Sequence, residues 1–316
     1  MSIDISAIIV NWNTKDLLLN CVQSIMQSSF IGAIEIIVVD NASFDGSVQA
    51  VKDKFPQTII IQNKENEGFS KANNRGILAA HGRYICLINS DVVVHADTLQ
   101  MMFTYMENDH LIGILGPKTM LTSGTLDRSF WKFPTLHGTF FRACGLNAVF
   151  PNIHFFNPNG AYNNIQDTIT GVDVLAGSFW MISKNAVEKV GLLDEDFFFY
   201  GEDFDYCKRM KDSGFKVVYF SLVGIDHILH GSSNKKPSVF YCRQRKADLL
   251  YWRKHHGPLL TFIVLGIYII HETTRFLLNV GRLIVSSNRS QTLIQVRKHG
   301  YCLVWLFTSK LPISLR

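Results

Sequence analysis

The sequence lacks the patterns that mark disulfide-stapled, exported or disordered chains. Its six cysteines form no Cys-x-x-Cys pair, and there are only 8 prolines among 316 residues. Scattered cysteines argue against a zinc site or a disulfide framework and fit a reducing compartment. The opening MSIDISAIIVNWN has no basic start and no cleavable apolar segment, so we expect no export signal. With 47% hydrophobic residues, the chain can bury a large core.

Two common phosphate-binding motifs are also absent. The chain contains neither a GxxxxGK[ST] loop nor a GxGxxG fingerprint. A diphosphate ligand would therefore need another source of positive charge. A divalent cation held by one or two carboxylates is the usual one.

Charge is unevenly distributed along the chain. Residues 241–316 contain twelve Lys or Arg and two acids, a net charge of +10, which leaves −5 for residues 1–240. The basic region includes PLLTFIVLGIYII (258–270), an uncharged run that is shorter than the roughly 20 residues of a bilayer span. A basic, amphipathic region predicts association with an anionic membrane surface, and the alternative is a helical hairpin packed on the main domain. Nucleic acid fits less well, because the cations alternate with aliphatic runs.

Apolar strand-like runs alternate with helical stretches in the first hundred residues. We expect strands at 6–12, 34–43, 58–63 and 83–94, and helices at 15–28, 45–55 and 71–80. Residues 117–170 are irregular and rich in aromatic residues, which is typical of a lid or a binding wall. The alternation predicts an α/β, Rossmann-like fold with a mostly parallel central sheet flanked by helices.

Polar side chains follow all four of these predicted strands. They are Asn11 to Asn13, Asp40-Asn41, Asn63 to Asn66 and Asn89-Ser90-Asp91. Turns alone favour Asn and Asp, but four such ends in succession exceed what turns require. Ligands of parallel sheets bind at the carboxyl ends of strands, so these residues, with Asn11, Asn41 and Ser90 among them, predict a ligand-binding edge. Asp91 is a candidate cation ligand, and His227 or His230 could add a nitrogen.

The stretch DEDFFFYGEDFDYCKRM (194–210) places carboxylates beside aromatic rings. One interpretation is an amphipathic element with its rings inside and its acids in water. The other is a cleft in which acids bind a metal, accept a proton or position hydroxyl groups against aromatic walls. We also expect Arg209 to pair with Asp205, four residues away on one helical face.

Five motifs occur in a recognisable order: VVDNASFDGS, NEGFSKANNRG, INSDVVV, LAGSFWMISKNAVEKVGLLDEDFFFYGEDFDYCKR and HILHGSS. From about residue 4 to residue 256, the chain resembles the family 2 glycosyltransferases, which are inverting, nucleotide-sugar-dependent enzymes of the GT-A fold. The likeness is to the branch of bacterial rhamnosyltransferases and O-antigen or cell-wall polysaccharide enzymes. It implies a GT-A domain over 1–240, with a donor half at 1–116 and an acceptor half at 117–240, followed by a membrane-associating helical region over 241–316.

The resemblance implies roles on the donor side. Asp40 is the acid expected to contact the base or ribose, and Asp91 is the metal-binding acid of a motif whose first acid is replaced by Asn89. His227 fits the family's late His best, with His230 left open. The donor loop and its helix contribute Asn66, Gly68, Phe69 and Asn73. Arg128, in LDRSF, is either a ligand of the donor diphosphate or an exposed loop arginine.

On the acceptor side, the resemblance implies that Asp203 is the catalytic base, beside Glu202. Gly177, in LAGSFW, corresponds to the small residue that opens the acceptor wall. Glu202 and Asp205 are expected to orient the acceptor or the local backbone. Tyr200 belongs to a row of rings that is either acceptor wall or core.

The expected function is transfer of a sugar, best L-rhamnose from dTDP-rhamnose, to a saccharide on a polyprenyl-phosphate carrier. The reaction would use Mg²⁺ or Mn²⁺ and serve O-antigen, lipopolysaccharide or similar synthesis at the cytoplasmic face of a bacterial inner membrane. Alternatives are a UDP-hexose donor or a non-catalytic sugar-nucleotide-binding scaffold. A nucleotidyltransferase would carry a Gly-rich basic loop after the first strand, where this chain has VNWNTKD.

Overall fold

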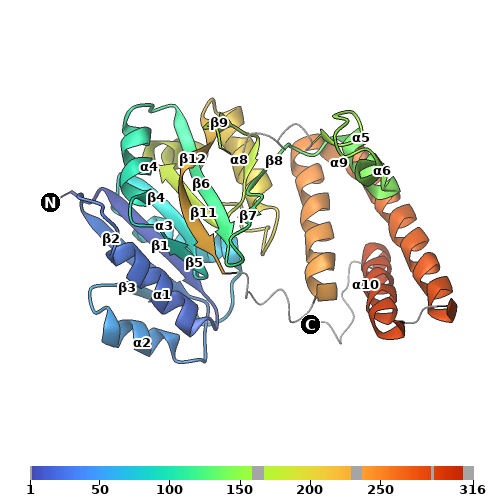
Figure 1. The fold of residues 1–316 in the computed structure, drawn as a ribbon, viewed down its shortest axis with the longest axis horizontal. Helices are drawn as coiled ribbons and strands as arrows, with labels where there is room; N and C mark the ends of the chain where they lie inside the picture. Colours follow the sequence, from blue (N-terminus) through green and yellow to red (C-terminus); the bar gives the residue numbers. More distant parts are fainter. Residues whose placement is uncertain (1, 159–166, 229–236, 286–287, 309–316) are drawn as a thin grey trace. The chain divides into compact units, whose positions relative to one another are not determined.

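The computed structural model describes residues 2–158, 167–228, 237–285 and 288–308, and the chain divides into two compact units (Figure 1). The α/β unit comprises Met1–Phe133 and Tyr162–Gly231, and the helical unit comprises Pro134–Ala161 and Ser232–Arg316. Residues 134–158 thus group with the C-terminal helices, although the sequence suggested that they belong to an acceptor half. The predicted domain boundary at residue 240 stays a prediction.

A mostly parallel central sheet forms the middle of the α/β unit, as predicted. Its main strands are β1 (Ile5–Asn11), β2 (Ile34–Asp40), β3 (Ile59–Gln62), β4 (Tyr84–Asn89), β5 (Val92–Val94), β6 (Ile112–Leu121), β11 (Phe179–Ser183) and β12 (Lys216–His227). They lie in the order β3-β2-β1-β4-β11-β6-β12-β5 (Figure 1). Strands β1 to β4 pair in parallel, as do β6 and β12, whereas β11 is antiparallel to both of its neighbours.

Short strands extend this framework near the site. Strand β7 (Leu126–Asp127) pairs with β6, β9 (Thr170–Gly171) pairs with β12, and β8 (Phe130–Trp131) pairs with β10 (Val174–Leu175). Strands β7 and β8 lie inside the stretch 117–170 that the sequence predicted to be irregular.

Helices cover both faces of the sheet. One face packs on α1 (Lys15–Met26), α2 (Ser47–Lys54) and α4 (Thr98–Glu107), and the other on α3 (Phe69–Ala79), α7 (Lys184–Val190) and α8 (Glu202–Asp212). Successive strand residues point to opposite faces, so Ile9 joins the first core and Ile8 the second. Burial on both faces explains why the strands are almost continuously apolar.

The run at 83–94, predicted as one strand, forms two. Strand β4 ends at Asn89, and after Ser90 and Asp91 the chain enters β5, which pairs antiparallel with the last residues of β12. In that pairing Val92 lies opposite His227. The break therefore brings Asp91 next to a residue from the far end of the sheet.

The helical unit contains α5 (Leu136–Cys144), α6 (Leu146–Val149), α9 (Pro237–Val285) and α10 (Arg289–Thr308). Helix α9 changes direction at Gly257, whose φ of 79° favours glycine and which is followed by Pro258. It consists of two helical segments, 237–256 and 258–285, against which α5 and α10 pack. The side chain of Thr135 caps α5, so a helix begins where the sequence suggested an irregular lid.

Candidate active site

Asn11 is the centre of a buried cluster at the carboxyl end of β1. Its partner across the parallel β1–β2 pair is Asp40, and both side chains are buried. The Asn11 Nδ2 atom lies 2.8 Å from Asp40 Oδ1, 3.0 Å from Ser43 Oγ and 2.8 Å from Ser47 Oγ. The backbone N–H of Ser43 also donates to Asp40 Oδ2 at 2.9 Å. The structure thus unites two of the predicted nucleotide-site residues, while contact of Asp40 with a base or ribose stays a prediction.

Thr14 connects this cluster to the end of β4. Its Oγ1 atom lies 2.7 Å from Asn11 Oδ1 and 2.8 Å from Ser90 Oγ. The neighbouring Asn89 donates its backbone N–H to Ser178 O at 3.0 Å, which ties the end of β4 to the turn before β11. Asn11, Asp40 and Ser90 are therefore parts of one continuous polar edge.

Amide side chains hold the predicted donor loop. Asn41 Nδ2 donates to Gly68 O at 3.0 Å, and Asn63 Nδ2 donates to Asn41 Oδ1 at 2.7 Å. Asn66 Oδ1 accepts from the N–H of Gly68 at 3.0 Å. Asn73 Nδ2 donates to the carbonyl of Phe69, one turn earlier in α3, at 3.0 Å. These amides fix the loop against β2 and α3, and direct donor contacts from them stay predictions.

Asp91 and His227 face each other across the β5–β12 pair. Asp91 Oδ1 lies 3.3 Å from His227 Nε2, and each side chain is 14% exposed. On the other side of the ring, His227 Nδ1 lies 3.9 Å from Asp127 Oδ2. One imidazole therefore stands between two carboxylates that come from distant parts of the chain.

The charge of this triplet is set by its two acids. Burial lowers the pKa of His227, but the carboxylates of Asp127 and Asp91 outweigh burial and raise the pKa to about 9. At neutral pH the imidazole is therefore protonated in the ligand-free chain. The position between the carboxylates is one that attracts positive charge.

The three acids in the first turn of α8 differ in their exposure to solvent. Glu202 and Asp205 are buried, at 7% and 2% exposed, whereas Asp203 is half-buried. Gly201, with a φ of 88°, precedes the helix, and the N-terminal end of a helix favours negative charge. The Asp203 carboxylate accepts the N–H of Phe204 at 2.9 Å. Asp203 is thus the acid of this turn that keeps access to solvent.

Glu202 has a different electrostatic state from its neighbour. Burial, with a further contribution from the Asp203 charge, raises the pKa of Glu202 to about 8. Its Oε2 atom is buried, and none of the described residues forms a hydrogen bond with it. At neutral pH Glu202 is mostly protonated, so it adds little repulsion to an ionised Asp203.

Asp205 forms the predicted pair with Arg209. Arg209 Nε donates to Asp205 Oδ2 at 2.8 Å, and Nη2 donates to Leu192 O at 2.9 Å. This partly buried pair connects α8 to the segment after α7. An acceptor-orienting role for Asp205 stays a prediction.

Aromatic residues join the donor loop to the acidic stretch. The N–H of Phe69 donates to Phe198 O at 2.7 Å, and a Cβ on Gly68 would lie 2.4 Å from that same oxygen. Phe69 also contacts Phe199 edge to face at 6.4 Å between ring centroids. A Cβ on Gly177 would lie 3.9 Å from the Phe69 ring. The predicted donor-side and acceptor-side residues therefore meet around Phe69.

Comparison with known proteins decides the family of this site. The model of the family "Glycosyl transferase family 2" matches residues 6–191, more than half of the chain. The chain belongs to glycosyl transferase family 2. Its matched region includes the polar edge, Asp91 and the Gly177 turn, and ends before α8. The fold of the glycosyltransferase is accordingly GT-A-like, with a central sheet flanked by helices and a long apolar C-terminal helix.

Similar proteins support this assignment. The glycosyltransferase is 27% identical over 228 residues to the low-salt glycan biosynthesis hexosyltransferase Agl10 of Haloferax volcanii, covering 71% of this chain and 67% of that protein. It is 24% identical over 238 residues to an N-acetylglucosaminyl-diphospho-decaprenol L-rhamnosyltransferase of Mycobacterium tuberculosis, covering 71% and 76%. Among solved structures, a mannosyltransferase of Pyrobaculum calidifontis in complex with GDP-Man and Mn²⁺ has a TM-score of 0.56 at 13% identity, covering 97% and 87%.

The donor set of the glycosyltransferase fits a divalent cation in part. Asp91 Oδ1 and His227 Nε2 are close enough to bind one ion together, and carboxylate and imidazole both suit Mn²⁺. In the part of the chain that the structure describes, no group of three or more His, Cys, Asp or Glu side chains forms a metal site. Such an ion would therefore complete its coordination with ligand oxygens and water. His230, the alternative nitrogen ligand, lies outside the described residues.

Three residues of the site were missed by sequence reasoning. They are Thr14, Asn74 and Asp127. Asn74 Nδ2 donates to Leu193 O at 2.8 Å and to Glu195 Oε1 at 3.0 Å, tying α3 to the acidic stretch. Asp127 directly precedes Arg128 in LDRSF, so its place in this motif is the signal that could have predicted it. Arg128 Nε lies 3.3 Å from Phe130 O, and a contact with a diphosphate stays a prediction.

Proposed function

We propose that this glycosyltransferase moves L-rhamnose from dTDP-rhamnose, with inversion, to a saccharide on a polyprenyl-phosphate carrier. The observation that carries the mechanism is the difference in burial among the acids of α8. Glu202 and Asp205 are buried, whereas Asp203 is exposed enough to receive a proton. The decaprenol-linked rhamnosyltransferase that the chain resembles supports the sugar and the carrier. The hexosyltransferase relative favours the second candidate, a UDP-hexose donor.

The proposed chemistry is a single in-line displacement. The acceptor hydroxyl oxygen forms a bond to the anomeric carbon as the bond from that carbon to the diphosphate breaks. Asp203 takes the hydroxyl proton, and the electron pair of the broken bond remains on the departing nucleoside diphosphate. Glu202, whose pKa is raised by burial, is the member of the pair that keeps its proton.

Asp91 and His227 are the proposed ligands of Mg²⁺ or Mn²⁺. The bound cation would supply positive charge to the departing diphosphate. Asn11, Asp40, Asn41 and Ser90 would hold the nucleotide at the polar edge. Gly177 and Tyr200 would face the acceptor.

The helical unit supports a peripheral location at the cytoplasmic face of a bacterial inner membrane, in O-antigen or similar polysaccharide synthesis. Among the described residues, one helix, Ser238–Val285, is long and apolar enough to cross a membrane by its length and composition. The excess of Lys and Arg in 241–316 favours an anionic membrane surface as its partner.

Donor titration tests this function. The purified chain is titrated with dTDP-rhamnose, UDP-glucose, UDP-galactose and UDP-N-acetylglucosamine, each with Mn²⁺ and with EDTA. We expect one donor to bind in a metal-dependent way, and the Asp91→Ala variant to bind it about 100-fold more weakly in Mn²⁺, with no further loss in EDTA.

Asp226→Ala is the matched control for Asp91→Ala. Asp226 is next to His227 in β12, but its carboxylate pairs with His95 at 3.1 Å and is 44% exposed. This variant should bind the donor like the wild type. Absence of binding by every donor, or equal binding by Asp91→Ala and the wild type, would contradict the proposed site.

A further inference from the structure

The second segment of α9, residues 258–285, presents an apolar face to the outside. We call the residues Leu259, Phe262, Ile263, Ile270, Leu277 and Ile284 the apolar stripe. All six are exposed, from 40% for Ile263 to 80% for Ile284. Their spacing of three, four and seven residues puts them on one face of the helix. The residues that share this face are Gly266, Thr273, Val280 and Gly281, so it carries no charge over about 38 Å of helix.

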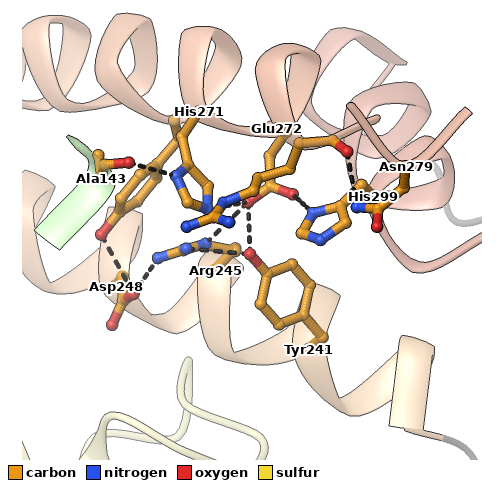
Figure 2. A network of polar contacts seen from close by, with 10 residues as sticks. Ala143, Tyr241, Arg245, Asp248, His271, Glu272, Asn279 and His299 are labelled. Atoms are coloured by element: carbon orange, nitrogen blue, oxygen red, sulfur yellow. Dashed lines mark hydrogen bonds and ion pairs between the residues drawn. The ribbon is translucent and has the colours of Figure 1, made fainter. Parts of the chain in front are cut away.

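The opposite face of the same segment carries buried polar groups (Figure 2). Glu272 is completely buried, and its carboxylate accepts from Tyr241 Oη at 2.5 Å and from His299 Nδ1 at 2.6 Å. Arg245 Nε lies 3.3 Å from the same carboxylate. His271 Nδ1 donates to Ala143 O at 2.8 Å. The network joins both segments of α9 to α10 and α5.

This arrangement is the reverse of a helix in water. A surface helix of a soluble protein buries its apolar face and exposes its charges. Here His271 and Glu272 are satisfied inside the helical unit and the apolar stripe lies outside, which is the distribution that a lipid environment favours. The stripe therefore needs a cover that the described residues do not provide.

The positive charge of the helical unit indicates what covers the apolar stripe. The described part of 237–308 contains ten Lys or Arg, and its two acids, Asp248 and Glu272, are both paired with Arg245. Exposed cations include Arg253, Lys254 and Arg282. Anionic lipid attracts such a surface, whereas a second copy of the chain would bring the same positive charge against it.

Helix α10 indicates how the stripe meets the lipid. Its first half contains Arg289, Arg297 and Lys298, with both arginines exposed. A hairpin crossing the bilayer would carry these charges into the hydrocarbon, at a cost of about 2.5–3.5 kcal/mol for each at the centre. A helix lying in the plane of the membrane keeps them in water.

We propose that the apolar stripe is embedded in the headgroup–acyl boundary of an anionic bilayer, with segment 258–285 parallel to the membrane plane. The inference deepens the proposed function, because it rests on the membrane partner proposed there and identifies the face and orientation of contact. Donor binding, measured on the same variants, separates a failure of this inference from a failure of the catalytic assignment.

Flotation of the full chain with vesicles tests the contact. The vesicles are phosphatidylcholine with about one-third phosphatidylglycerol, and the test variant is Ile270→Lys with Leu277→Lys. We expect its partition to fall at least about tenfold, since lysine at an acyl-facing position is costly. The matched control, Gln291→Lys with Gln295→Lys, adds the same charge at exposed positions of α10 and should float like the wild type.

Orientation is tested with two conservative variants that keep the stripe apolar, Phe262→Trp and Leu277→Trp. Lipids brominated at a shallow position of the acyl chain should quench the fluorescence of the two introduced tryptophans equally. Both tryptophans lie at the same depth if the helix is parallel to the membrane. Unequal quenching that changes with bromine depth would overturn the in-plane orientation. Unchanged flotation of the double lysine variant would overturn the membrane contact itself. A second result would also overturn it: the wild type forms a dimer without lipid, and the double lysine variant is a monomer that still floats with the vesicles.

Discussion

The two units of the chain place their buried polar side chains in opposite ways. In the α/β unit, Asn11, Asp40 and Ser90 lie at the end of an apolar sheet, and Asp91 and Asp203 keep some exposure. In the helical unit, Glu272 is enclosed by partners and the apolar stripe lies outside. The same residue types therefore have different roles. The partly exposed Asp91 and Asp203 are accessible to a ligand, whereas the closed network around Glu272 holds helices together.

This comparison predicts that Asp203→Asn affects catalysis and leaves stability unchanged. Removing the proton acceptor should lower the rate of transfer by roughly 10²–10⁴-fold, with donor affinity nearly as in the wild type. Steady-state transfer assays and donor titration measure the two effects. Asp196→Asn, an exposed change in the same stretch, is the control and should transfer at the wild-type rate. Wild-type activity in Asp203→Asn would remove Asp203 from the proposed mechanism.

Glu272→Ala should show the opposite pattern. Loss of Glu272 leaves Arg245 with Asp248, 3.6 Å away, as its remaining acid, so the free energy of unfolding should fall by up to roughly 3–5 kcal/mol. Urea unfolding followed by circular dichroism measures the change, and donor affinity at low urea should stay near the wild-type value. Asp212→Ala breaks an exposed pair with Lys208 and should cost at most about 1 kcal/mol. Equal costs for the two variants would show that the closed network does not stabilise the unit.

Glu202→Gln tests the buried acid beside Asp203, and its effect depends on pH. The folded chain keeps a proton on Glu202 up to about pH 8, whereas an ordinary Glu releases it near 4.5. Stability from this group is therefore complete below about pH 4.5, declines as pH rises and is lost above about pH 8. The decline is at most about 1.4 kcal/mol per pH unit.

Glutamine imitates the protonated form, so Glu202→Gln should lack this decline. Unfolding free energies at pH 5, 6, 7 and 8 measure it, with Glu188→Gln on the exposed side of α7 as the control. Parallel pH profiles for Glu202→Gln and the wild type would mean that Glu202 is ionised at neutral pH.

Much of the fold follows from local sequence patterns. The buried strands β1 to β4 and the helices between them come from short-range periodicity, which the sequence displays directly. The break after Asn89 could not be predicted, because β5 is defined by its pairing with β12, far along the chain. The proximity of Asp127 to His227 could not be predicted for the same reason, because the two residues are far apart in the sequence.

In the helical unit, composition alone does not predict which side chains are buried. In the sequence, His271 and Glu272 directly follow the uncharged run 258–270. In the structure both point inward to partners on other helices, and the apolar residues on either side of them are the exposed ones. A hydropathy pattern gives the period of a helix, but it does not say which face is covered.

The pairing of β5 with β12 also sets an order of events during synthesis. Asp91 leaves the ribosome long before His227, and β5 has no antiparallel partner until β12 has formed. The polar edge built on β1, β2 and β4 can be complete while the Asp91–His227 pair does not yet exist. A nascent or prematurely ended chain would thus hold the polar edge without the Asp91–His227 pair, which would form only with the last strand of the sheet.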